Sequence, residues 1–452
     1  MRIQQKGEKG PSNLNLKVEY ATAKGDAFAV RLSALLMAIW VMLQSASAAF
    51  IEPTDLLRDP SQEDWESLSR FNATTTRAQF EERLREVFDP FDGLSPFLNI
   101  TDSEVTVFSD TNHSLSVATI AFAASDQIRS PGNSFRWPAA AFNGWTGRPL
   151  AGLKVVIEPA DIGGQWGAME DRSTYYKGYG RIQEGDVNLL VSRILRLRLI
   201  QLGADVYVTR DDTEPVCGLE VSDVSPIVPW ILLGRSYILP AALRSRTRDV
   251  SRPSADYRRI AAEVLLIKTL ETRARAENAS LAIRADITIV LQFNATPTSG
   301  RTGLTSSNRN IFFVEGSYTA RELSNDARQR FRLLTKLFEN VTPTETRVAS
   351  CIARRFQEAT GFPPVLYGNT AITRATAAGP YVVARNLAFS REHDGPVVVT
   401  EPYFMNQPLT LQRLLAGDYE GEKVIAGIPC ASIYREYAEA VAAGLIDSYR
   451  LP

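Results

Sequence analysis

Four polar side chains stand at the ends of apolar or helical segments, where they could carry out acid–base or metal chemistry. Asp161, Gln292 and Glu401 each come after a short apolar run, and Glu184 comes directly before a long helical stretch. In an open α/β sheet, functional groups gather at the carboxyl ends of the strands. Carboxylates in such a position can move protons, and carboxylate and amide oxygens can hold a hard divalent cation. The arrangement therefore predicts one site formed by these four residues.

The elements that must position this site alternate along the chain. Strand-like runs cover residues 153–157, 205–209, 287–291 and 396–400, and helical stretches cover residues 186–202, 257–282 and 345–359. Strands that alternate with helices of this length favour a parallel sheet with helices on both faces. We therefore expect an α/β fold with a mixed, mainly parallel sheet. A long insertion with five prolines, residues 215–253, interrupts the alternation and is expected to lie over the edge or mouth of the sheet.

The segments that contain the four polar residues resemble those of a known family. They read Glu-Pro-Ala-Asp-Ile-Gly-Gly at 158–164, Gln-Glu-Gly-Asp at 183–186, Gln-Phe-Asn-Ala at 292–295 and Glu-Pro-Tyr-Phe at 401–404. Their order, spacing and context resemble the zinc-dependent N-acetylmuramoyl-L-alanine amidases, which cut the bond between muramic acid and the stem peptide of peptidoglycan. The resemblance covers residues 137–452 and includes Gly163-Gly164, Trp166, Met169-Glu170, Gly203-Ala204, Arg385-Asn386-Leu387 and the segment 417–421.

The resemblance implies a role for each of the four residues. In that family a His after the first strand, a Glu at the head of a helix and a second His hold zinc. The aligned positions here carry Asp161, Glu184 and Gln292, so both histidines are replaced. The family's catalytic Glu corresponds to Glu401. The resemblance implies zinc as the cofactor, and peptidoglycan glycan or stem peptide as the partner.

The replaced ligands leave three interpretations of the site. A catalytic zinc needs three protein ligands, usually nitrogen or carboxylate, and an open position for water. An all-oxygen set suits Mg²⁺, Ca²⁺ or Mn²⁺ better. The site therefore holds no metal tightly, holds a hard divalent cation, or retains weakened zinc catalysis. His113 and His393, the only histidines, lie in other segments.

Two functions of different class follow from these interpretations. In the first, the protein hydrolyses the muramoyl to L-alanine amide bond with impaired activity, and Glu401 acts as general base and then acid. In the second, it is a non-catalytic cell-wall binding protein or regulatory pseudoenzyme. Without a cation, Asp161, Glu184 and Glu401 would repel one another, so at least one pKa should rise.

The N-terminal third of the chain is predicted to contain an export signal and a small separate module. Residues 32–43 form an apolar run of the length of a signal-peptide core, basic residues precede it, and Ala46-Ser47-Ala48 matches a signal-peptidase site. We interpret residues 1–48 as a signal peptide, with an uncleaved anchor as the alternative. Residues 50–130 are expected to form an α+β module with a helix and a hairpin, and residues 137–452 the amidase-like domain.

The charge balance of the chain limits the kinds of partner that it can attract, and the export signal indicates its location. The 50 Lys and Arg nearly balance the 51 Asp and Glu, and a net charge of -1 gives no long-range attraction to nucleic acid or to anionic membranes. We therefore expect no nucleic-acid partner and no membrane contact beyond the export signal, whereas the oligomeric state is left open. Export places the protein in the periplasm or cell envelope. Cys217, Cys351 and Cys430 allow one disulfide and one free thiol, and Cys351 has the surroundings of a small buried side chain.

Overall fold

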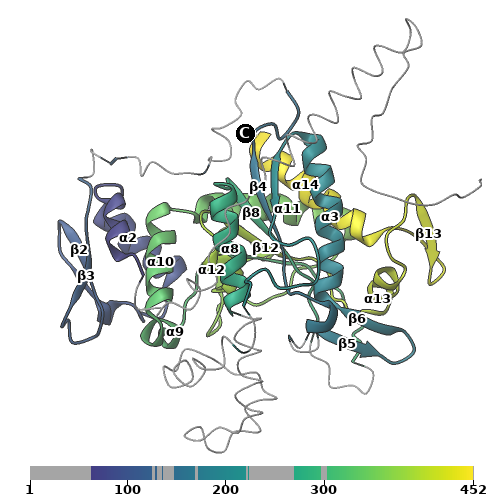
Figure 1. Ribbon diagram of the computed structural model, residues 1–452, viewed down its shortest axis with the longest axis horizontal. Helices are drawn as coiled ribbons and strands as arrows, with labels where there is room; N and C mark the ends of the chain where they lie inside the picture. The colour runs from purple at the N-terminus through teal and green to yellow at the C-terminus, as the bar shows by residue number, and fades with distance from the viewer. Residues whose placement is uncertain are drawn as a thin grey trace, which may run out of the picture. The chain divides into compact units, whose positions relative to one another are not determined.

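A computed structural model describes most of the chain beyond its N-terminal segment (Figure 1). The described residues are 63–124, 128–129, 135, 147–167, 170, 172–219, 222, 269–296 and 303–450. The predicted signal peptide and nearly all of the insertion at 215–253 lie outside these ranges. Within the ranges, no helix combines the length and the apolar character needed to cross a bilayer.

A seven-stranded mixed sheet forms the centre of the fold. From edge to edge its strands are β10 (Arg374–Ala375), β11 (Val382–Ala384), β9 (Ile311–Val314), β12 (Val397–Glu401), β8 (Ile287–Leu291), β4 (Lys154–Pro159) and β7 (Asp205–Val208). The pairs β4–β7, β4–β8, β8–β12 and β9–β11 are parallel, whereas β9–β12 and β10–β11 are antiparallel. This topology confirms the predicted mixed, mainly parallel sheet.

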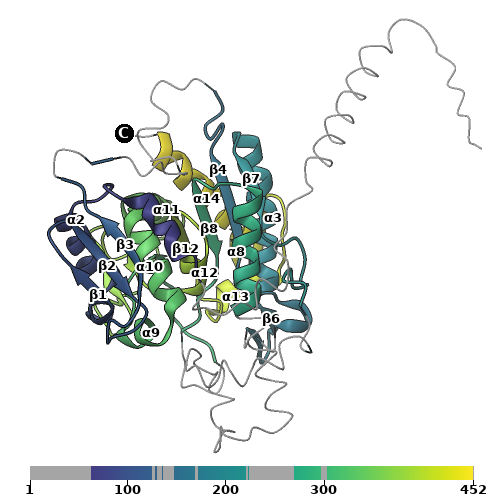
Figure 2. The same ribbon diagram turned by 60° about the vertical axis from the view of Figure 1, so that its left-hand side comes forward.

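Helices cover both faces of the sheet, as Figures 1 and 2 show. Alternate residues of a strand point to opposite faces, and Val155 and Ile157 of β4 pack in one core with α3 (Glu184–Leu202), α11 (Thr342–Thr360) and α14 (Ile433–Arg450). The opposite face is covered by α8 (Glu271–Ala282) and α12 (Ala388–Glu392), which contact each other. All five residues of β8 are buried, because both of its faces are covered.

Two of the long helices on one face, α11 and α14, approach each other closely. A Cβ atom at Gly444 of α14 would lie 2.6 Å from the Cα atom of Ile352 of α11. Such a distance is far below a normal contact, so glycine is required there. The helical stretch predicted at 345–359 corresponds to α11, whereas no prediction covers α14.

The remaining helices and strands lie before, between and after the strands of the central sheet. They are η3 (Trp65–Phe71), α2 (Arg77–Arg83), η4 (Leu84–Phe88), η5 (Ser95–Phe97), β1 (Leu98–Ile100), β2 (Glu104–Phe108), β3 (Ser116–Ala121), η6 (Gly164–Trp166), β5 (Ser173–Tyr176), β6 (Gly180–Gln183), α9 (Ala320–Asn325), α10 (Ala327–Glu339), α13 (Pro408–Leu415), β13 (Glu422–Ile425) and β14 (Ile428–Ala431).

The N-terminal part shares a core with two helices from much later in the chain. The pairing of β2 with β3 forms the predicted hairpin, and β1 adds a third strand. Phe71 and Phe80 of this part pack in one cluster with Leu334 and Phe338 of α10. Phe71 stacks on Phe338, with ring centroids 5.6 Å apart. The division into a module at 50–130 and a domain at 137–452 stays a prediction.

The three cysteines are free thiols. Cys217 and Cys430 are buried, and Cys351 on α11 is half-buried, so it is more exposed than its sequence surroundings predict. No disulfide therefore joins these three positions.

A buried ion-pair cluster joins β4 to α8. The guanidinium of Arg275 lies 2.9 Å from Glu158 Oε1 and 2.7 Å from Glu271 Oε1. His393 Nε2 lies 3.3 Å from the other oxygen of Glu158. Burial alone would raise the pKa of Glu158, but Arg275 and His393 lower it to about 2. The carboxylate is therefore ionised at neutral pH and depends on its cationic partner.

Replacement of this buried arginine is expected to destabilise the protein strongly. Arg275→Met leaves Glu158 and Glu271 buried without their cation, which costs about 3–5 kcal/mol in the free energy of unfolding. Arg198→Met is the matched control, because it breaks an exposed pair with Glu439 and should cost less than about 1 kcal/mol. Urea unfolding of both variants measures the difference, and equal losses would contradict the assigned role of Arg275.

The same pair predicts how stability depends on acid. The folded pKa of Glu158, about 2, lies below its ordinary 4.5. Its stabilising contribution is therefore present above pH 4.5 and disappears as the pH falls towards 2, a change of about 3 kcal/mol. Wild type should lose stability more steeply over this range than Glu158→Gln, whereas Glu439→Gln should follow wild type. Parallel unfolding curves for wild type and Glu158→Gln would show that the prediction is wrong.

Candidate functional site

The loop after β4 holds Asp161 in a left-handed backbone conformation, with a φ angle of 58°. The next two amides point inward, because the N–H groups of Ile162 and Gly163 donate to the carboxylate of Glu170 at 2.8 and 3.1 Å. Burial, together with the nearby Asp161, raises the pKa of Glu170 to about 7. Gly163 has a φ of 80°, and a Cβ there would lie 2.4 Å from Asp186 Oδ1. The loop is thereby held tightly against the start of α3.

Glu184 is the first residue of α3, and its side chain is buried. The N–H of Phe293, just past the end of β8, donates to Glu184 Oε1 at 3.2 Å. The N-terminal end of a helix also favours a negative charge. Glu184 is therefore held at the carboxyl ends of the strands, close to Asp161.

Arg172 supplies the positive charge that these two carboxylates share. Its Nε atom lies 3.3 Å from Glu184 Oε2 and 3.7 Å from Asp161 Oδ2. Its main-chain oxygen accepts a hydrogen bond from the N–H of Glu184 at 3.0 Å. The guanidinium is thus within ion-pair distance of both predicted metal ligands.

Gln292 lines the same cavity as Asp161 and Arg172, a space of about 220 Å³. Its main chain is fixed at the end of β8, where its N–H donates to the Thr400 carbonyl at 3.0 Å. Its own carbonyl accepts from the Tyr437 hydroxyl at 2.9 Å. The cavity therefore brings together two of the four predicted site residues, Asp161 and Gln292, with Arg172, whereas Glu184 and Glu401 do not line it.

Glu401 ends β12 and accepts a hydrogen bond from Asn294 Nδ2 at 2.7 Å. Burial raises the pKa of Glu401 to about 7, although Arg385 and Arg172 act in the opposite direction. Asn294 follows Gln292 by two residues, so the same strand end supports both parts of the site.

The carboxylates of the site repel one another, as the sequence analysis anticipated. Burial and the neighbouring Asp161 raise the pKa of Glu184 well above its usual range, and Glu401 adds to the rise. Arg172 opposes it. The positive charges that oppose the repulsion are the guanidinium groups of Arg172, which acts on Glu184 and Glu401, and of Arg385, which acts on Glu401.

The residues of this site do not fit a zinc ion. Among the residues that the structure describes, no group of three or more His, Cys, Asp or Glu side chains could hold a metal. His393 contacts Glu158, and His113 lies in the hairpin turn, where its Nε2 is 3.1 Å from the Pro96 carbonyl oxygen. Catalytic zinc takes imidazole, thiolate or carboxylate ligands and leaves one position open to water. Here the available side-chain atoms are oxygens, and a guanidinium already pairs with two of them.

Two residues that shape the site were not identified as functional from the sequence. Glu170 belongs to the segments that resemble the amidase family but has no predicted role, and nothing in the sequence pattern points to Arg172. An arginine two positions after a glutamate is a common pattern, so it carries no signal for this role. Only the fold shows that Arg172 meets Glu184, 12 residues further along.

Comparison with known proteins finds similarity in solved structures. No family model matches the chain, and no curated protein matches its sequence. Cwp6 from Clostridium difficile has 14% identity and a TM-score of 0.34, and the similarity covers 66% of this chain but only 30% of Cwp6. The catalytic domain of CwlV, an N-acetylmuramoyl-L-alanine amidase from Bacillus (Paenibacillus) polymyxa var. colistinus, has 14% identity and a TM-score of 0.32. The similarity covers 65% of this chain and 95% of the CwlV domain. Ami1 from Mycobacterium smegmatis, an N-acetylmuramyl-L-alanine amidase, has 14% identity and a TM-score of 0.34. The similarity covers 66% of this chain and 99% of Ami1.

Restoration of a zinc site should require removal of Arg172 as well as new ligands. Asp161→His with Gln292→His, beside Glu184, recreates a set of two histidines and a glutamate. We expect this double variant to bind zinc at least about tenfold more weakly than a triple variant that also carries Arg172→Ala, because the guanidinium repels the ion. Competition with a chromophoric chelator measures both affinities.

The matched control adds Arg181→Ala to the double variant. Arg181 belongs to the neighbouring strand β6 and donates to the Ser173 hydroxyl, so its removal should leave zinc affinity unchanged. Equal zinc affinity in the double and triple variants would show that Arg172 does not compete with the metal.

Proposed function

We propose that this protein binds peptidoglycan, through its glycan or stem peptide, without cutting the muramoyl to L-alanine bond by zinc chemistry. The peptidoglycan part rests on the resemblance of the segments at 158–164, 183–186, 292–295 and 401–404 to the amidase family. The non-catalytic part rests on one observation, the pairing of Arg172 with Asp161 and Glu184.

Arg172 supplies positive charge to Asp161 and Glu184 but cannot supply the catalytic chemistry of zinc. Zinc lowers the pKa of its bound water to about 7 and so makes a nucleophile. A guanidinium keeps its proton and has no open coordination position, so it cannot do this. It can donate hydrogen bonds to a carboxylate or carbonyl, which is a binding role. The site formed by Arg172, Asp161 and Glu184 is therefore suited to hold a polar ligand.

The cavity beside Arg172 suits one part of a larger ligand. Its volume of about 220 Å³ is below the range of about 300–1,000 Å³ that is usual for a whole small molecule. Gln292 and Thr272 offer polar groups, and Leu387 and Phe389 offer apolar surface. A sugar N-acetyl group or a short peptide side chain has this mixture of polar and apolar atoms.

Hydrolysis with a hard divalent cation is the second candidate. Asp161, Glu184 and Gln292 would be its ligands, and Glu401 the general base. The all-oxygen donor set favours this candidate, since Mg²⁺, Ca²⁺ and Mn²⁺ prefer oxygen. It requires Arg172 to move away from both carboxylates.

A peptidoglycan-binding protein acts outside the cytoplasmic membrane, so we propose that this protein is exported to the periplasm or cell envelope. The signal-peptide pattern of residues 1–48 supports this location.

The purified protein is expected to co-sediment with insoluble peptidoglycan and to release no stem peptide, with or without EDTA. Gln292→Ala should weaken co-sedimentation about threefold or more, because it removes a hydrogen-bonding group from the cavity. Gln201→Ala, on an exposed face of α3, should not. Chromatography of the supernatant measures release, and metal analysis accompanies it. EDTA-sensitive release would favour hydrolysis with a cation, and failure to sediment would contradict binding.

A further inference from the structure

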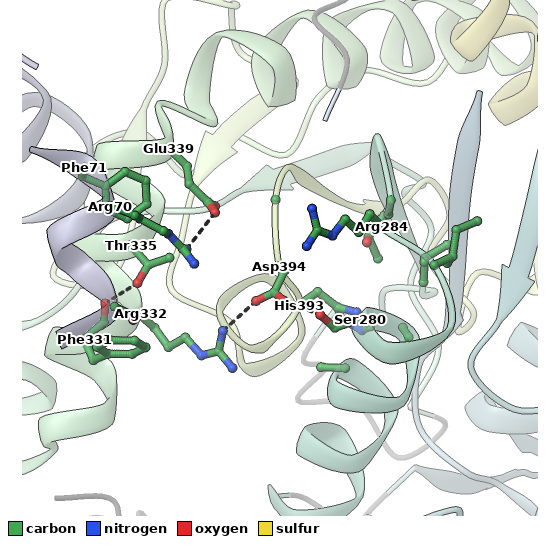
Figure 3. Close-up of a pocket in the computed structure, with 18 residues that line it drawn as sticks. Arg70, Phe71, Ser280, Arg284, Phe331, Arg332, Thr335, Glu339, His393 and Asp394 are labelled. Atoms are coloured by element: carbon green, nitrogen blue, oxygen red, sulfur yellow. Dashed lines mark hydrogen bonds and ion pairs between the residues drawn. The ribbon is translucent and has the colours of Figure 1, made fainter. Parts of the chain in front are cut away.

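A second cavity of about 510 Å³ lies at the other end of the sheet (Figure 3). Ala285 and Gly395 line it, and these residues come before β8 and β12, whereas Gln292 and Glu401 stand at the opposite ends of the same strands. The other walls come from η3, α8 and α10. The volume falls within the range of about 300–1,000 Å³ that is typical of small-molecule sites.

Three arginines surround this cavity, and only two have an acidic partner among the residues the structure describes. Arg70 Nη2 lies 3.3 Å from Glu339 Oε1, and Arg332 Nη1 lies 2.9 Å from Asp394 Oδ1. Arg284 makes no ion pair within the described part of the chain, and Figure 3 shows its guanidinium directed into the space between these two pairs. The lining therefore carries one positive charge more than its two carboxylates neutralise.

The cavity is open to solvent and also has apolar surface. The Arg70 side chain is 53% exposed, and Arg284 is exposed, so a ligand can reach both. Phe71, Phe331 and Ala279 contribute apolar walls. Guanidinium groups bind carboxylate and phosphate through two parallel hydrogen bonds, which suits an anion placed against Arg284.

We propose that this cavity binds a small anionic ligand, a carboxylate or a phosphate, through Arg284 with support from Arg70 and Arg332. The ligand's charged group meets the Arg284 guanidinium, and the rest of the ligand packs against the apolar wall of Phe71 and Phe331. The site is separate from the cavity beside Arg172 and does not depend on the function proposed for that cavity.

A purely structural role for Arg284 makes a different prediction. Arg284 follows the C-terminal end of α8 by two residues, where the helix dipole favours a positive charge. If this were its only role, replacement would lower the stability of the protein slightly and change no binding equilibrium. Binding measurements therefore separate the two roles.

The test is calorimetric titration of the full protein with inorganic phosphate and, separately, with succinate at constant ionic strength. We expect at least one of the two anions to bind, and Arg284→Gln to weaken that binding at least about tenfold, the loss expected when a charge-assisted hydrogen bond is removed. Arg321→Gln, an exposed arginine of α9 outside the cavity, is the matched control and should bind as wild type does.

The two arms also identify the ligand chemistry. Binding of phosphate alone assigns the site to phosphate-bearing ligands, and binding of succinate alone assigns it to carboxylates. A second variant, Ala279→Phe, fills the cavity without a change of charge and should also abolish binding. The proposal is overturned if neither anion binds wild type, or if Arg284→Gln binds as tightly as wild type.

Discussion

Buried carboxylates need a positive partner, and this constraint organises the functional half of the molecule. In this protein arginine side chains provide the positive charge. Arg275 pairs with Glu158 and Glu271 between β4 and α8. Arg172 pairs with Asp161 and Glu184 at the carboxyl ends of the strands. An unpaired buried charge would cost several kcal/mol, so these contacts are conditions for the fold as well as features of the site.

The two arginine clusters differ in exposure, although Arg172 and Arg275 both line the cavity of about 220 Å³. The Arg275 side chain is 2% exposed, and its pairs join β4 to α8 in the interior. The Arg172 side chain is 44% exposed and borders a cavity. Water weakens an ion pair at such a position, so a ligand that offers its own carbonyl or carboxylate can compete for the guanidinium. A binding role is therefore compatible with the charge balance of the site.

Two separate cavities lie near the ends of the parallel strands of the sheet, one at each end. Parallel β4, β8 and β12 bring their carboxyl ends together, which creates the site around Arg172. Their amino ends meet α8, α10 and η3, and the second cavity with Arg284 forms there. The shared core of the N-terminal part with α10 supplies one wall of that cavity, so this part of the chain is needed to complete it.

The sequence by itself determined the strands β4, β7, β8 and β12 and the helices α3 and α11, because apolar runs and helical periodicity are local signals. It also predicted a site at Asp161, Glu184, Gln292 and Glu401, because they lie in short motifs at the ends of these elements. Only the tertiary structure decided that β9 runs antiparallel to β12, since a four-residue apolar run has no directional signal. Likewise, Arg172 contacts Glu184 and Arg275 contacts Glu158 only after folding. Charge pairs between residues far apart in the chain produce no repeating pattern in the sequence.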